Sequence, residues 1–128
     1  MNQDTAITLS GSVEVDIFSG LPNPVWIMNS DQVTTFMNKL KTCMPTAPTE
    51  MFDGLGYRGF LVTVANPTGA SKQFTAAIHN GIVKLTSNGA DQPSYFIDTD
   101  RSIERWLLDE SRTHLDSELQ SMIEESWN

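Results

Sequence analysis

The dipeptide Asn80-Gly81 is the feature that most constrains how this chain of 128 residues folds. Both residue types tolerate the positive φ angles of the tightest hairpin turn, and alternating sequences flank them. A two-residue loop at this point pairs His79 with Ile82 and fixes the register of both strands. One face then carries Ala76, Ile78, Val83 and Leu85, and the other carries Thr75, Ala77, His79, Ile82, Lys84 and Thr86. The first face is expected to be the core face of an antiparallel sheet.

Other periodic segments add strands and helices to this hairpin. Alternation predicts strands at 13–17, 59–65 and 73–79, and a further one near 95–98. Helical spacing of apolar residues predicts a helix that begins at Ser30 or Asp31 and ends before Pro45. Two C-terminal helices are expected, with a break near Thr113, because the apolar stripe shifts there. We therefore predict an α+β fold: an antiparallel β-meander of about four to five strands packed against one helix from the N-terminal half and two C-terminal helices.

Length and charge narrow the function classes. The length fits a single α+β domain over residues 1–128, with residues 1–9 expected as a flexible tail. A net charge of −8 opposes a phosphate backbone, so no nucleic-acid partner is expected. The charge divides into −4 over residues 1–53, +3 over 54–90 and −7 over 91–128. The acidic C-terminal part is expected to be a solvated helical face or a surface that attracts a basic partner.

No segment of the sequence indicates a membrane span, because the most apolar window, residues 60–65, is far too short. Cys43 is the single cysteine, which excludes an intrachain disulfide and a multi-cysteine metal site. The first ten residues lack the basic and apolar regions of a secretory signal. We therefore expect a cytoplasmic protein.

Several short patterns resemble chemical motifs and are interpreted as structural. Gly54, Gly56 and Gly59 match a dinucleotide fingerprint in spacing, but a strand rather than a helix is expected to follow. Asp98 and Asp100 precede a predicted helix and are expected to cap it rather than bind magnesium. The remaining polar candidates are Glu14 and Asp16 as paired carboxylates, and His79, His114 and Cys43, which form no recognisable zinc or nucleophile pattern. No metal and no cofactor are predicted.

Two loops stand out as candidate recognition surfaces. The segment 19–24 holds two prolines and follows the first strand, and 44–58 is long for a compact domain. Aromatic, proline and arginine side chains in or beside these loops are the predicted peptide-binding residues: Phe18, Pro22, Pro24, Trp26, Tyr57 and Arg58. Arg58 is the candidate partner for a peptide carboxylate.

Three segments carry a resemblance to known proteins. They are Phe18-Ser19-Gly20-Leu21-Pro22-Asn23-Pro24-Val25-Trp26, Gly56-Tyr57-Arg58-Gly59-Phe60 and Glu104-Arg105-Trp106-Leu107-Leu108. Together they resemble a group of small bacterial proteins with an FSG-x-PNP-x-W motif. The chain is also similar to accessory peptide-binding proteins of ribosomally made peptide pathways, such as that of crocagin. The resemblance implies peptide binding in natural-product biosynthesis and supplies no catalytic residues.

These observations favour a non-catalytic accessory module that binds a peptide or protein by strand addition and flanking loops. One alternative is a small isomerase or hydrolase that uses Glu14, Asp16 or His79. Another is an acidic inhibitor or immunity-type protein whose terminal helices cover a basic enzyme. A free sheet edge would also allow a homodimer, which is compatible with every one of these functions.

Overall fold

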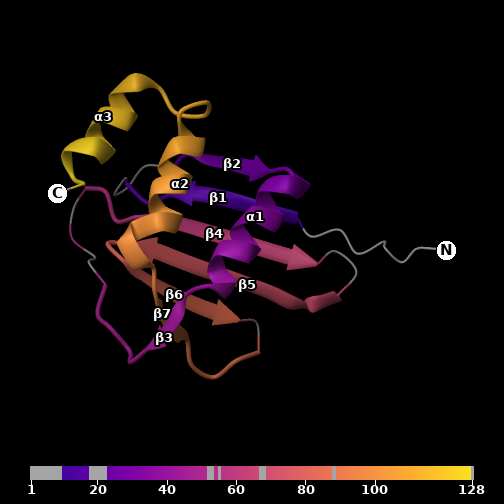
Figure 1. The fold of residues 1–128 in the computed structure, drawn as a ribbon. Helices are drawn as coiled ribbons and strands as arrows, with labels where there is room; N and C mark the ends of the chain where they lie inside the picture. The colour runs from indigo at the N-terminus through magenta and orange to yellow at the C-terminus, as the bar shows by residue number, and fades with distance from the viewer. Residues whose placement is uncertain are drawn as a thin grey trace.

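The protein is an antiparallel sheet with helices on one face (Figure 1). The computed structural model describes residues 10–17, 23–51, 54, 56–66, 69–87 and 89–127. In these residues the strands are β1 (Ser10–Val15), β2 (Val25–Met28), β3 (Met44–Thr46), β4 (Phe60–Asn66), β5 (Gly69–His79), β6 (Ile82–Ser87) and β7 (Ser94–Ile97). The helices are α1 (Ser30–Lys41), α2 (Ser102–Ser111) and α3 (Ser117–Glu125), with a short 3-10 turn, η2 (Thr99–Arg101), before α2. The predicted α+β class is confirmed.

The sheet order is β2-β1-β4-β5-β6-β7-β3, and every neighbouring pair is antiparallel. The central strands β4 to β7 form a meander in chain order. β1 and β2 extend the sheet beyond β4, and β3 extends it beyond β7. The hairpin register is confirmed, with His79 opposite Ile82. Asn80 and Gly81 have φ angles of 52° and 87°, as the two-residue turn requires.

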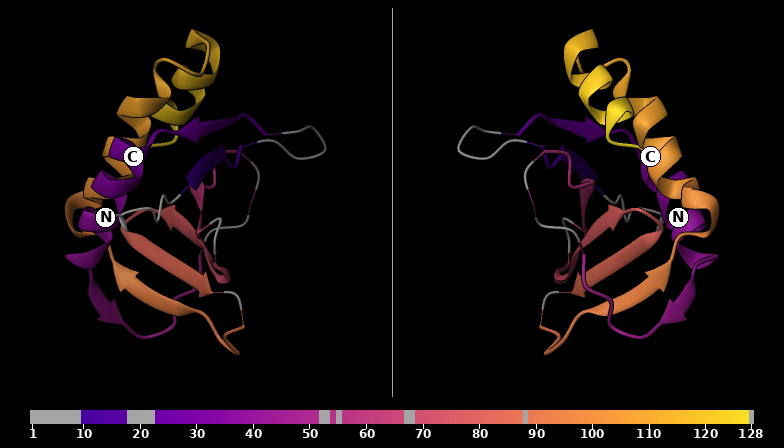
Figure 2. Two further views of the ribbon diagram at one scale, coloured as in Figure 1. Left: turned by 90° about the vertical axis from the view of Figure 1, so that its right-hand side faces the viewer. Right: turned by 90° about the vertical axis from the view of Figure 1, so that its left-hand side faces the viewer.

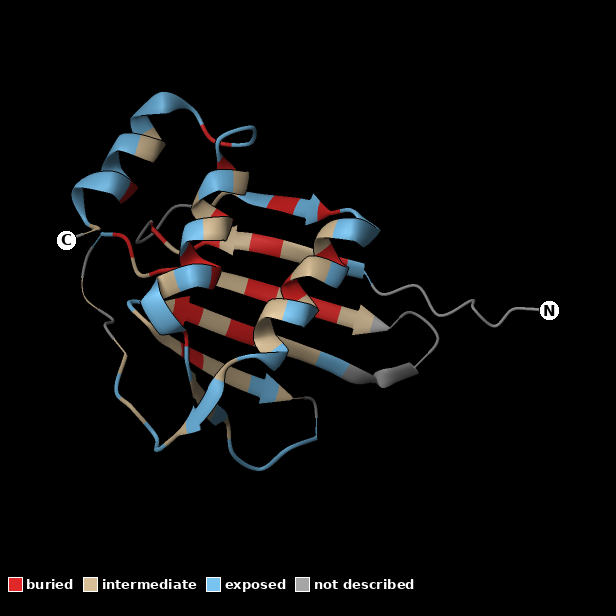
Figure 3. Ribbon diagram, in the orientation of Figure 1, coloured by how far each residue is buried: buried red, intermediate tan, exposed pale blue. Residues whose placement is uncertain are grey.

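The helices cover one face of the sheet and leave the other face open (Figure 2). Along the covered face, Val15, Phe60, Ile78 and Val83 lie opposite one another from strand to strand and are buried. Figure 3 shows this buried band continuing beneath α1 and α2. It packs against helix residues that include Val33, Phe36, Ile103 and Leu107. Burial of these apolar side chains is the main driving force for the fold.

The structure corrects the predicted cap of the first helix. Asn29, rather than Ser30 or Asp31, caps α1: its side chain accepts from the Gln32 amide, and the Gln32 side chain accepts from the Asn29 amide. The predicted break between the C-terminal helices is confirmed, and Asp116 caps α3 by accepting a 2.9 Å hydrogen bond from the Leu119 amide. Trp106 of α2 packs against the core and is partly buried.

Two strands were not predicted from the sequence, and one of them, β3, lies inside the predicted loop 44–58. β2 follows Pro24 directly, and β3 contains Pro45. Both are edge strands of the sheet, where a missing amide donor is tolerated if it would have faced outward. They raise the strand count from the expected four or five to seven among the described residues.

Candidate functional site

The outer edge of β2 offers unpaired backbone groups. The Val15 amide donates to the Pro24 carbonyl at 3.0 Å, so these residues form a hydrogen-bonded pair of the β1–β2 ladder. Such pairs alternate in antiparallel strands. The backbone N–H and C=O groups of Trp26 and Met28 therefore face β1. Those of Val25 and Ile27 face away from the sheet. Among the described residues, no hydrogen bond outside the ladders uses these outward groups.

The side chains of β2 divide between the two faces. Val25 and Ile27 lie on the open face with 57% and 72% of their surfaces exposed, whereas Trp26 and Met28 are buried beneath the helices. Beside Ile27 the open face has a shallow cavity of about 220 Å³ lined by Ser10, Gly11, Ser12, Ile27, Thr63 and Ala65. The edge thus combines free backbone groups with exposed β-branched side chains, the features that favour pairing with another strand.

The opposite edge strand, β3, lacks a backbone donor at its central residue. The Asp98 amide donates to the Gly81 carbonyl at 2.8 Å, so Asp98 and Gly81 form a hydrogen-bonded pair that continues the β6–β7 ladder. Because such pairs alternate, the backbone N–H and C=O groups of Phe96 face β6. Pro45 lies opposite Phe96 and therefore faces outward from β3. Proline has no amide hydrogen, so this edge lacks a donor where an added strand would need one. Of the two edges, β2 is the one equipped for pairing.

Trp26 fixes the C-terminal helices over β2. Its indole stacks on the His114 ring with centroids 4.8 Å apart and planes within 3°. The indole also lies 6.5 Å from the Phe60 ring, centroid to centroid, in an edge-to-face arrangement. The α2–α3 connection therefore lies against the buried side of β2, and Figure 2 shows α3 extending beyond this end of the sheet.

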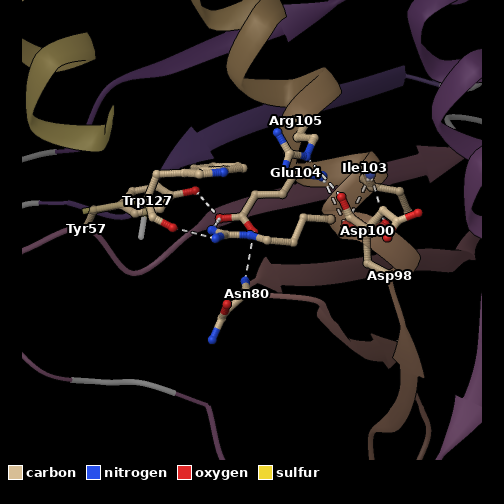
Figure 4. A network of polar contacts seen from close by, with 9 residues as sticks. Tyr57, Asn80, Asp98, Asp100, Ile103, Glu104, Arg105 and Trp127 are labelled. Atoms are coloured by element: carbon tan, nitrogen blue, oxygen red, sulfur yellow. Dashed lines mark hydrogen bonds and ion pairs between the residues drawn. The ribbon is translucent and has the colours of Figure 1, made fainter. Parts of the chain in front are cut away.

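A buried polar network lies at the start of α2 (Figure 4). The Glu104 carboxylate is fully buried and accepts from Tyr57 Oη at 2.5 Å, the Asn80 amide at 2.7 Å, and the Arg101 guanidinium at 2.9 and 3.0 Å. Arg101 also donates to the Trp127 carbonyl at 2.7 Å and lies 3.7 Å from the centroid of that indole. Glu104 therefore joins the long loop, the central hairpin and the C-terminal segment.

The surroundings of Glu104 shift the pKa values of two neighbouring groups. Burial, and then the adjacent Glu104 carboxylate, raise the pKa of Tyr57 far above its usual range. Burial lowers the pKa of His79, whose ring lies 5.4 Å from the Tyr57 ring. Both shifts favour the neutral forms. A buried carboxylate with this many donors serves to hold the fold, because its lone pairs are already occupied.

Asp98 acts as the helix cap that the sequence predicted. Its carboxylate accepts from the amides of Ile103 and Glu104 at 2.9 to 3.1 Å. Burial raises the pKa of Asp98 although these bonds oppose the shift. Asp100 instead uses its backbone carbonyl, which accepts from the Arg105 side chain at 3.0 Å. Nothing in this arrangement brings the two carboxylates together on a metal.

The predicted peptide-binding residues fall into separate positions. Phe18 and Pro22 lie outside the described residues. Pro24 is half-buried and ends the loop, with its carbonyl bonded to Val15. Trp26 and Tyr57, expected as contact residues beside loops, are only 6% and 3% exposed and pack inside the protein. Their large apolar rings are stabilised by burial, which overrides their position next to turn residues.

Arg58 is held by the protein's own groups. Its guanidinium donates to Asp16 Oδ1 and to the Gly54 carbonyl, both at 2.8 Å, and its side chain is 18% exposed. The backbone repeats the link, since the Arg58 amide donates to the Asp16 carbonyl at 2.7 Å. Arg58 thus fastens the long loop to the end of β1, and the structure does not bring it to the edge of β2.

The other polar candidates also have structural contacts. Glu14 accepts from the Asn23 side-chain amide at 2.8 Å, so both strand carboxylates hold loops against β1. Burial raises the pKa of Cys43, which favours the thiol over the nucleophilic thiolate. In the described part of the chain no group of three or more His, Cys, Asp or Glu side chains is placed to hold a metal ion.

Sequence reasoning missed Val25 and Ile27 as site residues. Val25-Trp26-Ile27-Met28 is apolar throughout and shows no period-two alternation in sequence, so exposed and buried positions alternate only in the structure. Comparison with known proteins adds no further guidance, since no protein family, curated protein or solved structure matches this chain. Among the described residues, no helix is long and apolar enough to cross a membrane.

Proposed function

We propose that this protein is a non-catalytic accessory module that binds an extended segment of a peptide or protein partner as an additional strand on β2. The observation that carries the proposal is the outward row of N–H and C=O groups on Val25 and Ile27, next to their exposed side chains. Backbone hydrogen bonds would supply affinity, and alternate side chains would supply specificity. The resemblance to accessory proteins of peptide biosynthesis supports the same role.

The contrast between the two edges supports a single binding position. Pro45 removes the central donor of β3, whereas Pro24 precedes β2 and leaves its outward donors intact. The recognition residues are therefore Val25 and Ile27, with Pro24 and Trp26 shaping the edge from inside. Tyr57 and Arg58 would act at a distance, by holding the long loop.

The test is a binding screen of the full chain against a tiled library of synthetic peptides, followed by an N-methyl scan of any hit. Methylation at alternate residues, those whose amides face β2, should abolish binding, while methylation at the intervening residues should leave it nearly unchanged. Uniform tolerance of methylation would overturn strand addition. Chromatography of the peptide before and after incubation checks for turnover, and an altered peptide would support the enzyme alternative.

Substitution of the protein gives a matched pair for the same test. Ile27→Pro removes the outward donor without removing a bond of the β1–β2 ladder, and should lower affinity at least about tenfold. Ile27→Ala keeps the outward amide while removing most of the same side chain, and should lower affinity less than Ile27→Pro does. Circular dichroism of both variants confirms that the sheet persists. Equal binding by the Ile27→Pro variant would contradict the proposal.

A further inference from the structure

The side chains of a strand added to β2 would face two different environments. Side chains of successive residues alternate between the faces of a sheet, so half of them would extend onto the open face beside Val25 and Ile27. The other half would point toward the helix layer, at the end where the α2–α3 connection lies against Trp26. The ligand's two sets of side chains therefore meet different chemistry.

The open-face side is apolar where it borders the edge. Val25 and Ile27 are largely exposed, and the cavity beside Ile27 lies on the same face. Cross-strand pairs of β-branched or aromatic side chains stabilise a sheet by about 0.2–1 kcal/mol each. Apolar ligand side chains would be favoured on this side.

The helix side is acidic. Residues 109–125 contain six acids and one arginine, a net charge of −5. The arginine, Arg112, already faces Asp109 at 3.4 Å and Glu124 at 3.6 Å. Asp116 and Glu118 lie within four residues of His114, and both are exposed. Charge complementarity favours basic side chains on the ligand residues that face this segment.

We infer that the segment bound at β2 is a strand in which apolar residues alternate with lysine or arginine. This inference rests on the proposed function and adds the class of ligand to it. A second copy of the chain fits less well, because β2–β2 pairing about a two-fold axis would bring two segments of charge −5 to the same junction.

The experiment compares three synthetic probes by fluorescence anisotropy at low and high salt. One alternates lysine with valine, one alternates glutamate with valine, and one has the lysines and valines in separate blocks. The alternating basic probe should bind at least about tenfold more tightly than either of the others, and its advantage over the acidic probe should shrink as salt rises.

Charge removal on the protein gives the matched control. Asp116→Asn/Glu118→Gln keeps an α3 cap, since asparagine caps as well as aspartate, and should weaken the basic probe several-fold. Glu50→Gln/Asp91→Asn removes the same charge from exposed positions outside the acidic segment and should change little. Equal weakening by both double variants would show a nonspecific charge effect and overturn the inference.

The outcomes separate this inference from the proposed function. If the acidic probe binds as tightly as the basic probe, and both lose binding in the Ile27→Pro variant, strand addition stands and the basic ligand class is wrong. If the basic probe binds equally to the Ile27→Pro variant, strand addition itself fails. Dimers that light scattering shows in the absence of any probe, and that the Ile27→Pro variant does not form, would assign the edge to a second copy and overturn the inference.

Discussion

Gly59 has no room for a side chain. Its φ angle is +105°, and an added Cβ would lie 2.2 Å from the Ile78 carbonyl oxygen and 2.8 Å from the His79 Cβ. The Gly59 carbonyl also accepts from the Asp16 amide at 2.9 Å, so the backbone cannot move away freely. Close approach of two strands, rather than the dinucleotide spacing it resembles, explains this glycine.

We therefore expect Gly59→Ala to lower the free energy of unfolding by at least about 3 kcal/mol, from backbone strain plus the clash. Gly56→Ala is the control, because Gly56 has a similar φ of +89° but nothing within 4 Å of the added Cβ. That variant should lose only about 1–2 kcal/mol. Urea unfolding measures both, and equal losses would show that strain alone matters.

Tyr57 illustrates how a buried hydroxyl contributes to stability. Tyr57→Phe removes one donor from the buried Glu104 carboxylate and should reduce the free energy of unfolding by about 1–3 kcal/mol at neutral pH. The raised pKa of Tyr57 means that the folded protein keeps the phenol proton above pH about 10, where the unfolded chain loses it. This contribution is present below pH about 10 and falls as pH rises further.

The difference in stability between wild type and the Tyr57→Phe variant should accordingly shrink above pH about 10. Denaturant unfolding over the alkaline range measures that difference. A difference that stays constant to the alkaline limit would contradict the raised pKa of Tyr57.

The sequence indicated Trp26 and Tyr57 as notable residues but not their environment. Trp26 lies two residues after Pro24 and Tyr57 directly follows Gly56, and an aromatic ring near such residues either packs inward or faces a ligand. The choice depends on His114 and Glu104, which lie more than forty residues away along the chain. Local sequence patterns do not identify partners so distant along the chain, so the burial of Trp26 and Tyr57 could not be predicted from them.

At the level of elements, local sequence patterns predicted the elements that depend mainly on neighbouring residues. The central hairpin, the three helices and the break before α3 each depend on neighbouring residues, and all are confirmed. β2 and β3 are only four and three residues long and border or contain a proline. Their strand state comes from pairing with β1 and β7, which the sequence at those positions does not encode. The edge that carries the candidate site was therefore missed.

Pro45 makes an element-scale prediction possible. Pro45→Val restores an outward amide to β3 and adds a β-branched side chain to an edge that already exposes Met44 and Ile97. We expect this variant to self-associate in a concentration-dependent way, as measured by light scattering coupled to size exclusion. Pro45→Lys, which restores the amide but adds an edge charge, should stay monomeric; association of both variants would show that the amide alone suffices.

At the scale of the whole molecule, the C-terminal segment is held by the network around Glu104. Arg101 contacts Trp127 through both its carbonyl and its ring, and Arg105 lies 5.7 Å from the same ring. The C-terminal segment therefore packs against the start of α2, beside the hairpin turn and the long loop. α3 is fixed at one end by this contact and at the other by the His114–Trp26 stack.

Trp127→Ala should lower the free energy of unfolding by about 1–3 kcal/mol, because it removes the cation–π contact and buried ring area. Trp127→Phe keeps an aromatic face for Arg101 and should recover about half of that loss. Thermal and urea unfolding measure both variants. No loss in the alanine variant would mean that the carbonyl contact alone holds the segment.

The strand order also bears on how the chain assembles in time. β4 to β7 are neighbours in both sequence and space, so they can nucleate with short loop closures. β1 must then join β4, while β3, at residues 44–46, finds its partner only in β7, at residues 94–97. During synthesis, β1 and β3 leave the ribosome before β4 and β7, the strands with which they pair. The nucleus of folding is thus expected to form from the middle of the chain, with the N-terminal segments added last on its two flanks.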